Sequence, residues 1–73
     1  MANFRVESEV TGSVWKIEVA VGDTVSAGDV LIIIESMKME IPLESPVGGC
    51  VTELLVKTQD PVEEGQVLAV IAA

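Results

Sequence analysis

The sequence has no histidine, a single cysteine (Cys50) and only two aromatic residues, Phe4 and Trp15. A lone cysteine cannot form an intramolecular disulfide, which favours a reducing compartment, and without histidine there is no thiolate and imidazole set for zinc. The sequence also lacks a hydroxyl and base pair and a phosphate-binding loop, so it gives no support to catalysis by this chain alone.

Basic residues are scarce too. Four lysines and arginines stand against twelve aspartates and glutamates, which gives a net charge of −8 and a pI near 4.1. Such a chain lacks the basic surface that nucleic-acid phosphates require, so nucleic-acid binding is excluded. Anionic membranes would repel the acidic surface, which instead favours protein partners with a basic face.

Long hydrophobic runs are missing as well, and none approaches the ~20 residues that span a bilayer. The first residues, Met1 to Arg5, lack a charged leader followed by an apolar core. Hydrophobic residues make up 49% of the sequence and charged residues 22%, which is typical of a globular protein. We therefore expect a single domain over residues 1–73 that is cytoplasmic and is a monomer when isolated.

What the sequence does contain is a repeat. When residues 4–36 are laid on residues 41–73 without a gap, an offset of 37, twelve pairs are identical, where about two or three would match by chance. The identical pairs are Glu7/Glu44, Ser8/Ser45, Val10/Val47, Gly12/Gly49, Val14/Val51, Val19/Val56, Asp23/Asp60, Val25/Val62, Gly28/Gly65, Val30/Val67, Leu31/Leu68 and Ile34/Ile71. The two halves are therefore one structural unit used twice, and neither can cover its own apolar face alone.

Apolar and polar residues alternate with a period of two between turn residues, which predicts short strands through both halves. The expected strands are 4–9, 14–19, 24–25, 30–35, 41–45, 51–57, residue 62 and 67–72. Turn residues lie near 12, 22–23, 26–29, 48–49, 59–61 and 64–65. Eight strands with turns at such regular spacing predict an all-β sandwich or flattened barrel.

Three of these strands carry specific predictions. The strand 14–19 should place the apolar residues Trp15, Ile17 and Val19 on one face and Lys16 and Glu18 on the other. The apolar run 30–35 predicts a strand buried on both faces; a buried helix is the alternative, but six residues between turns favour a strand. Pro42 and Pro46 remove ladder donors, so the strand 41–45 should lie at a sheet edge.

The stretch from Glu35 to Glu40 lies at the junction of the two halves and predicts a hairpin tip, with Met37 and Lys38 as the two loop residues. The facing pairs would be Ser36/Met39, Glu35/Glu40 and Ile34/Ile41. Two-residue turns need positive φ and prefer Asn-Gly or Gly-X, so a Met-Lys turn implies local strain. The like-charged pair of glutamates also requires a nearby cation, for which Lys38 is the candidate.

Lys38 is the candidate functional residue of this tip. A lysine that is to be acylated must stand clear of the fold and tolerate the loss of its charge. An ordinary lysine amine is neutral in only about one molecule in a thousand at physiological pH, and neighbouring carboxylates favour the charged form. The chain therefore cannot activate its own nucleophile, and another protein must carry out the acylation.

Each feature of the tip also has an ordinary explanation. An exposed lysine is usually just a solvated charge, and methionines more often fill cores than serve recognition. The combination favours function, because a lone lysine stands between two methionines at the pivot of a gapless duplication.

These residues closely resemble a known family over nearly the whole chain. Glu35-Ser36-Met37-Lys38-Met39 is similar to the (A/S)-M-K-M attachment motif of biotinyl domains. The segments 22–31, 60–68 and 45–51 resemble the family patterns G-D-x-V-x-x-G-x-x-L, its second copy, and A-P-x-x-G-x-V. The length and the Val14-Trp15-Lys16 run make the chain look most like the small free-standing biotin/lipoyl attachment proteins.

The resemblance implies a flattened barrel of two four-stranded antiparallel sheets, with the hairpin opposite the termini. It also implies a non-catalytic biotin carboxyl carrier, in which biotin protein ligase joins biotin to Lys38 through an amide. The chain would then carry carboxybiotin from a biotin carboxylase site to a carboxyltransferase site, as the swinging-arm subunit of a carboxylase or decarboxylase. The residues that would mark the site for the ligase are Glu35, Ser36, Met37, Met39 and Glu40.

Two positions depart from the family pattern. The first half reads Glu9-Val10-Thr11-Gly12 and lacks the usual proline before this glycine, and Gln59 replaces the usual glycine before Asp60. Both changes bear on turn geometry and not on attachment. No extra loop interrupts the first half, so the thumb of some bacterial acetyl-CoA carboxylase carriers is absent, which speaks against that particular complex.

Two other functions stay open. Lipoyl domains more often show D-K-A at the modified lysine, but a lipoate carrier of a dehydrogenase complex, or dual modification, is the nearest alternative. An unmodified interaction module would keep the fold and would not need Lys38. The mass added to Lys38 in cells separates these possibilities.

Overall fold

The part of the chain that the computed structural model describes, residues 2–73, is built from β-strands. The strands are β1 (Asn3–Glu7), β2 (Gly12–Ile17), β3 (Thr24–Val25), β4 (Val30–Ser36), β5 (Met39–Glu44), β6 (Gly49–Leu54), β7 (Pro61–Val62) and β8 (Val67–Ala72). All eight predicted strands are confirmed, although several ends move by one to a few residues. Within the same range, there is no helix of the length and apolarity needed to cross a membrane.

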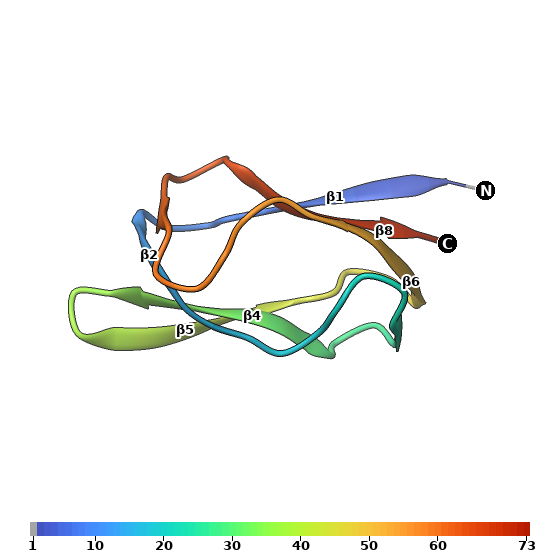
Figure 1. Cartoon of the computed structure of the whole chain (residues 1–73), viewed down its shortest axis with the longest axis horizontal. Helices are drawn as coiled ribbons and strands as arrows, with labels where there is room; N and C mark the ends of the chain where they lie inside the picture. The colour runs from blue at the N-terminus through green and yellow to red at the C-terminus, as the bar shows by residue number, and fades with distance from the viewer. Residues whose placement is uncertain (1) are drawn as a thin grey trace.

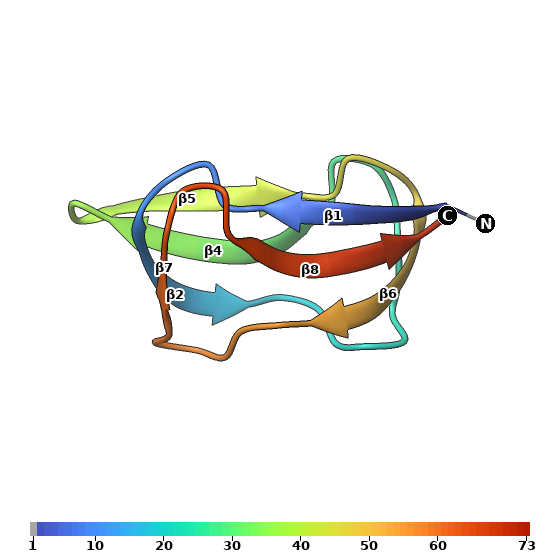
Figure 2. The ribbon, with the colours of Figure 1, turned by 90° about the horizontal axis from the view of Figure 1, so that it is seen from above.

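The strands form two antiparallel sheets of four. The terminal sheet has the order β1-β8-β6-β3, and the tip sheet has the order β5-β4-β2-β7. Figure 1 shows the sheets as two layers in a molecule that measures 36 × 18 × 18 Å. Seen from above (Figure 2), the β4–β5 hairpin extends at one end and the chain termini lie at the other. The expected flattened all-β barrel is confirmed, and so is the position of the hairpin opposite the termini.

The duplication seen in the sequence is repeated in the backbone hydrogen bonds. Each sheet contains two strands from each half of the chain. The amide of Gly22 donates to the carbonyl of Val51 at 2.7 Å, and the amide of Gln59 donates to the carbonyl of Val14 at 2.6 Å. The second bond is the first one shifted by the offset of 37. The halves thus bond to each other reciprocally, and neither forms a complete sheet by itself.

The core between the two sheets is aliphatic. Its largest fully buried side chains are Leu31, Ile32, Ile34, Leu68, Ile71, Val14, Val51 and Val62. Six of these form the identical pairs Val14/Val51, Leu31/Leu68 and Ile34/Ile71 of the repeat. Each buried Val, Leu or Ile stabilises the fold by roughly 1.5–3 kcal/mol, so the shared core holds the halves together.

The prediction that β4 is buried on both faces is only partly right. Its register shifts between Val30 and Ile32, which marks a β-bulge, and Leu31 and Ile32 are both fully buried. Ile33 is half-buried on the outer face of the tip sheet. The consecutive apolar residues therefore reflect a bulge, and the outer face of the strand is not covered by another layer.

The prediction that Trp15 shares one face with Ile17 and Val19 is wrong. The register of β2 shifts between Val14, which is buried, and Lys16, so Trp15 occupies a bulge and is 45% exposed. An inserted residue breaks the period of two, so Trp15 and its neighbour Lys16 are both exposed. The prediction is right for Ile17 and Val19, because both are half-buried and pack against the core.

The predicted edge position of the proline-containing strand is confirmed. β5 forms one edge of the tip sheet, where Pro42 breaks no ladder on its free side. Pro46 lies just beyond the end of β5, which ends at Glu44. Within residues 2–73, β5 pairs with β4 alone, so the β4–β5 hairpin lies at the edge of the tip sheet.

Candidate functional site

The β4–β5 hairpin has the predicted register. The cross-strand partners are Ser36/Met39, Glu35/Glu40 and Ile34/Ile41. Met37 and Lys38 are therefore the two loop residues, as the sequence indicated. The inner pair anchors the hairpin, because Ile34 is fully buried and Ile41 is half-buried opposite it.

The turn has left-handed backbone at both loop residues. Met37 has a φ of 52° and Lys38 a φ of 65°, the sign that a type I′ turn requires at both central positions. Among the non-glycine residues of 2–73, Gln59 is the one other case of positive φ. Side chains with a Cβ are disfavoured there, so the predicted strain is confirmed and the paired strands hold it in place.

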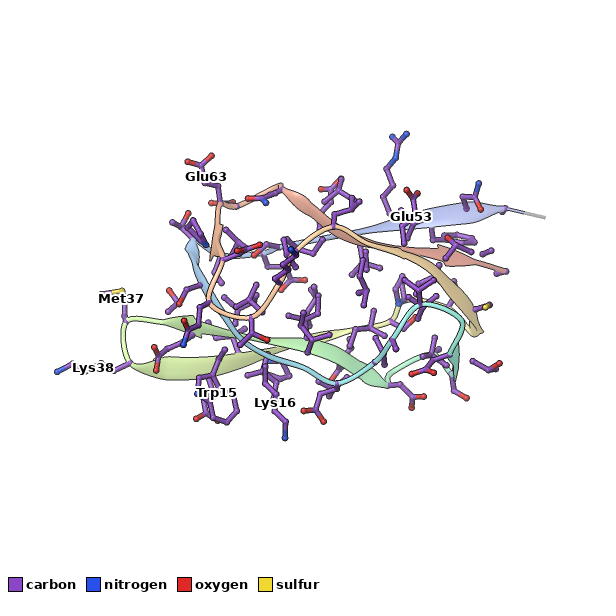
Figure 3. The ribbon with its side chains drawn as sticks, in the orientation of Figure 1. Trp15, Lys16, Met37, Lys38, Glu53 and Glu63 are labelled. Carbon is purple, nitrogen blue, oxygen red and sulfur yellow. The ribbon has the colours of Figure 1, made fainter. Side chains whose placement is uncertain are left out.

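The side chains at the tip extend into solvent. Met37 is 93% exposed, Met39 is 65% exposed and Lys38 is exposed between them. Figure 3 shows Met37 and Lys38 projecting beyond the end of the hairpin. The methionines are therefore not core residues, which removes the ordinary explanation for their presence.

The ion pair suggested between Lys38 and its neighbouring glutamates is not formed. Within residues 2–73 the structure contains one ion pair, between Lys16 Nζ and Glu18 Oε1 at 3.2 Å. Glu35 and Glu40 lie directly opposite each other and are both exposed. Acylation of the Lys38 amine would therefore break no ion pair, and the two carboxylates remain available to a basic partner.

The hairpin is held near its turn by the loop between β1 and β2. Ser36 Oγ donates a hydrogen bond to the Thr11 carbonyl at 2.8 Å, and the Glu64 amide donates to Thr11 Oγ1 at 3.3 Å. A Cβ at Gly12 would overlap the carbonyl oxygen of Glu35. Gly12 thus allows a close backbone approach, and Thr11 ties the hairpin to the second half.

All six site residues expected from the sequence lie on this one hairpin, but they are not equivalent. Glu35, Met37, Met39 and Glu40 are exposed around Lys38. Ser36 is half-buried and its hydroxyl is engaged with Thr11. Sequence reasoning missed Thr11, because its bond to Ser36 joins positions 25 residues apart and leaves no local pattern.

Comparison with known protein families gives a match over most of the chain. The biotin/lipoyl family model, described as "Biotin-requiring enzyme", matches residues 5–71. The biotinylated protein TB7.3 homolog of Mycobacterium leprae is 42% identical over 67 residues, covering 92% of this chain and 94% of that protein. The biotin/lipoyl attachment protein of Bacillus subtilis is 43% identical over 63 residues, covering 86% of each chain.

A solved structure shares the fold. The urea carboxylase of Kluyveromyces lactis superposes with a TM-score of 0.93 and 44% sequence identity over 99% of this chain. This chain spans only 6% of that protein. The fold therefore occurs both as a small free chain and as a small part of a large carboxylase.

Proposed function

The chain belongs to the biotin/lipoyl attachment family, and from that premise we propose that Lys38 is the residue to which it covalently binds biotin. The protein is a biotin carboxyl carrier domain and is not itself an enzyme. One observation carries the assignment of Lys38. It stands at the tip of a strained two-residue turn, exposed and free of ion pairs within the described chain, between two exposed methionines.

The residues of the tip fit an amide-linked group. The Nζ of Lys38 extends beyond both sheets, so an acyl chain joined to it meets no strand. Burial of the core and pairing of β4 with β5 do not involve this side chain. When bound, biotin would supply a carboxyl-carrying ring at the end of a flexible arm.

Attachment requires a ligase, because amide formation from a carboxylate and an ammonium group is unfavourable without activation. We propose that biotin protein ligase presents an acyl adenylate made with ATP. The Lys38 amine, after losing a proton, forms the new C–N bond, and the C–O bond to AMP breaks. Met37, Met39, Glu35 and Glu40 contribute recognition: the methionines offer apolar contacts, and the carboxylates attract a basic ligase surface.

The flanking methionines favour biotin over lipoate as the natural group. Carboxylase components are the partners of carrier domains of this type. We propose that the loaded chain visits a biotin carboxylase site and then a carboxyltransferase site. Because the hairpin projects from the end opposite the termini, the tip can enter an active site while the rest of the molecule stays outside.

We further propose that residues 1–73 act as one attachment domain, monomeric when isolated and located in the cytoplasm. The shared core and the strands exchanged between the halves support one folding unit. A net charge of −8 opposes self-association. A cytoplasmic location agrees with a ligase that draws on ATP.

The carrier function can be tested with the isolated chain. After loading by biotin protein ligase, the chain is incubated with a biotin carboxylase, ATP and radiolabelled bicarbonate, and protein-bound label is counted after rapid desalting. We expect label on wild type and background counts on Lys38→Arg, which keeps the charge but forms no amide in this reaction. Equal label on both proteins, or none on loaded wild type, would contradict the proposal.

A further inference from the structure

Trp15, the one tryptophan of the chain, lies on the outer surface of the tip sheet. It is 45% exposed, and Figure 3 shows it and Lys16 pointing from β2 away from the terminal sheet. A tryptophan of this exposure loses much of its hydrophobic contribution to the fold. The attachment chemistry at Lys38 does not use it either.

The strand register places Trp15 beside the apolar Ile33 and Pro42 and the charged Lys16, next to the tip. Lys16 pairs with Ile33, and Ile33 pairs with Pro42, so these residues form one row across β2, β4 and β5 on the outer face. Trp15 lies in the bulge beside this row. We call Trp15, Ile33 and Pro42 the tip-side patch. The next outward-facing row toward Lys38 contains Glu35 and Glu40, so the patch has an acidic border on its tip side.

The equivalent positions in the second half of the repeat show that the fold does not need this patch. Thr52 is equivalent to Trp15 by the offset of 37 and occupies the matching bulge in β6, between Val51 and Glu53. It fits there with its hydroxyl donating to the Val70 carbonyl at 3.2 Å. In the terminal sheet, Arg5 takes the place that Pro42 has in the tip sheet. The same backbone thus accepts polar residues at two of the three patch positions, while the third, Ile33, is matched by the apolar Val70.

The patch is close enough to Lys38 to share its partner. Trp15 lies beside Ile34, which precedes Lys38 by four residues, a span of roughly 13 Å at the rise of a β-strand. A standard interface covers about 800 Å² on each partner, which as a disc has a radius of roughly 16 Å. A protein that covers Lys38 from the outer face of the tip sheet therefore also covers Trp15.

We propose that the tip-side patch is the docking surface for the ligase that acylates Lys38, and this inference rests on the proposed function. The ligase must bring the bare amine to its acyl donor, so it has to approach as closely as one lysine side chain allows and contact the flanks of the tip. A carboxylase component reaches its group at the end of a much longer arm. The matching ligase surface is an apolar socket for Trp15, with lysine or arginine on the side that meets Glu35 and Glu40.

The test uses purified biotin protein ligase with biotin and ATP, and measures initial rates of biotin transfer against the concentration of the whole chain. The variant Trp15→Thr copies the residue that the fold accepts in the equivalent bulge. We expect it to raise the KM for the chain roughly tenfold or more, with kcat at saturation changed less than twofold, because an aromatic anchor is lost and the amine is untouched. Pro42→Arg, which copies Arg5, should also raise KM because it places a cation in the apolar patch, next to the basic side of the ligase surface.

Two controls separate docking from folding and chemistry. Thr52→Trp puts the same aromatic residue on the terminal sheet and should leave KM unchanged. Lys38→Arg, which cannot be acylated, should inhibit the ligase competitively, and the double variant Lys38→Arg/Trp15→Thr should show a Ki raised by the same factor as the KM. Cooperative thermal unfolding of every variant verifies the fold.

The outcomes distinguish this inference from the proposed function. If wild type is biotinylated and both Trp15→Thr and Pro42→Arg keep the wild-type KM, the docking surface is overturned while the carrier function stands. A Trp15→Thr chain that is biotinylated normally but loaded poorly by biotin carboxylase would assign the patch to that enzyme and overturn the ligase proposal. If biotin is not transferred to wild type, the proposed function fails, and the same kinetics with lipoate ligase then decide the docking claim.

Discussion

At the scale of single residues, the two halves form the same turn with different amino acids. Gly22 has a φ of 99°, and its equivalent Gln59 has a φ of 75°. Both precede an aspartate whose Oδ2 accepts an amide hydrogen bond from three residues earlier: Asp23 from Ala20 and Asp60 from Lys57. Glycine adopts this conformation freely, whereas a residue with a Cβ is strained in it. The departure of Gln59 from the family pattern therefore has a local energetic cost.

Replacing Gln59 with glycine should remove that cost. We expect Gln59→Gly to raise the free energy of unfolding by about 0.5–1 kcal/mol, because relief of the strain exceeds the added entropy of the unfolded chain. Urea unfolding followed by far-UV circular dichroism measures the change. Thr58→Gly is the control. Thr58 directly precedes Gln59 and has no positive φ, so this variant should lower the free energy of unfolding. A lower midpoint for Gln59→Gly would refute the assigned strain.

Gly12 and Gly49 form the second residue-scale test, because both are required by close backbone contacts. A Cβ on Gly12 would overlap the Glu35 carbonyl, and a Cβ on Gly49 would overlap the Ala72 carbonyl. We expect Gly12→Ala and Gly49→Ala each to lower the free energy of unfolding by about 2–4 kcal/mol. Gly48→Ala is the matched control, since its nearest contact would be an ordinary 3.6 Å. Equal midpoints for all three variants would show that the backbone yields at no cost.

Much of the site at this scale could be predicted from the sequence. Lys38, its two methionines and the facing glutamates follow from a short palindrome-like stretch at the centre of the repeat, so local pattern was sufficient. The role of Ser36 could not be predicted, because its hydroxyl bonds to Thr11 across 25 positions. Long-range side-chain bonds depend on how strands meet, which a local pattern does not encode.

At the scale of elements, the β4–β5 hairpin combines a strong anchor with a weak turn. Ile34 and the paired strands fix its register, while Met37 and Lys38 hold positive φ without the asparagine or glycine that such turns prefer. An exposed methionine at the strained position 37 points to selection for recognition over stability.

Substituting the first turn residue, Met37, should separate its effect on recognition from its effect on stability. We expect Met37→Asn to stabilise the chain by about 0.5–1 kcal/mol, because asparagine tolerates the left-handed region, while it lowers the kcat/KM of biotin transfer to Lys38. Thermal unfolding and ligase kinetics on the same samples give both values. Met37→Leu, which keeps an apolar side chain but not its shape, should show a slower transfer without the gain in stability. Unchanged transfer to Met37→Asn would rule out recognition of this methionine.

The strands themselves were predictable, but the bulges were not. Alternation and turn residues indicated all eight strands, and the mirror arrangement around Met37 and Lys38 set the hairpin register. In β2, apolar and polar residues alternate from Trp15 onward, but Val14 and Trp15 are adjacent apolar residues, and the sequence does not show which of the two faces the core. The outward orientation of Trp15 depends on pairing with β4, which is a property of the sheet and not of the strand.

At the scale of the whole molecule, the halves depend on each other. Each sheet holds two strands from each half, and the core cluster includes Val14 and Val51, Leu31 and Leu68, and Ile34 and Ile71 from opposite halves. A separated half would expose most of this apolar surface to water. It would also leave the sheet edges unpaired.

We therefore expect peptides of residues 1–37 and 38–73 to be unfolded when studied separately. Far-UV circular dichroism and one-dimensional proton NMR should show no strand signal and no dispersed methyl resonances from either peptide. The intact chain under the same conditions is the control. A cooperative unfolding transition in one isolated half would contradict the interdependence of the halves.

The measurement that most directly tests the central claim is the intact mass of the chain after co-expression with biotin protein ligase, beside the variant Lys38→Arg. We expect wild type to gain the mass of one biotinyl group and Lys38→Arg to gain none, with fragmentation placing the added mass on Lys38. An added mass that persists in Lys38→Arg, a lipoyl group in its place, or an unmodified wild type would contradict the account.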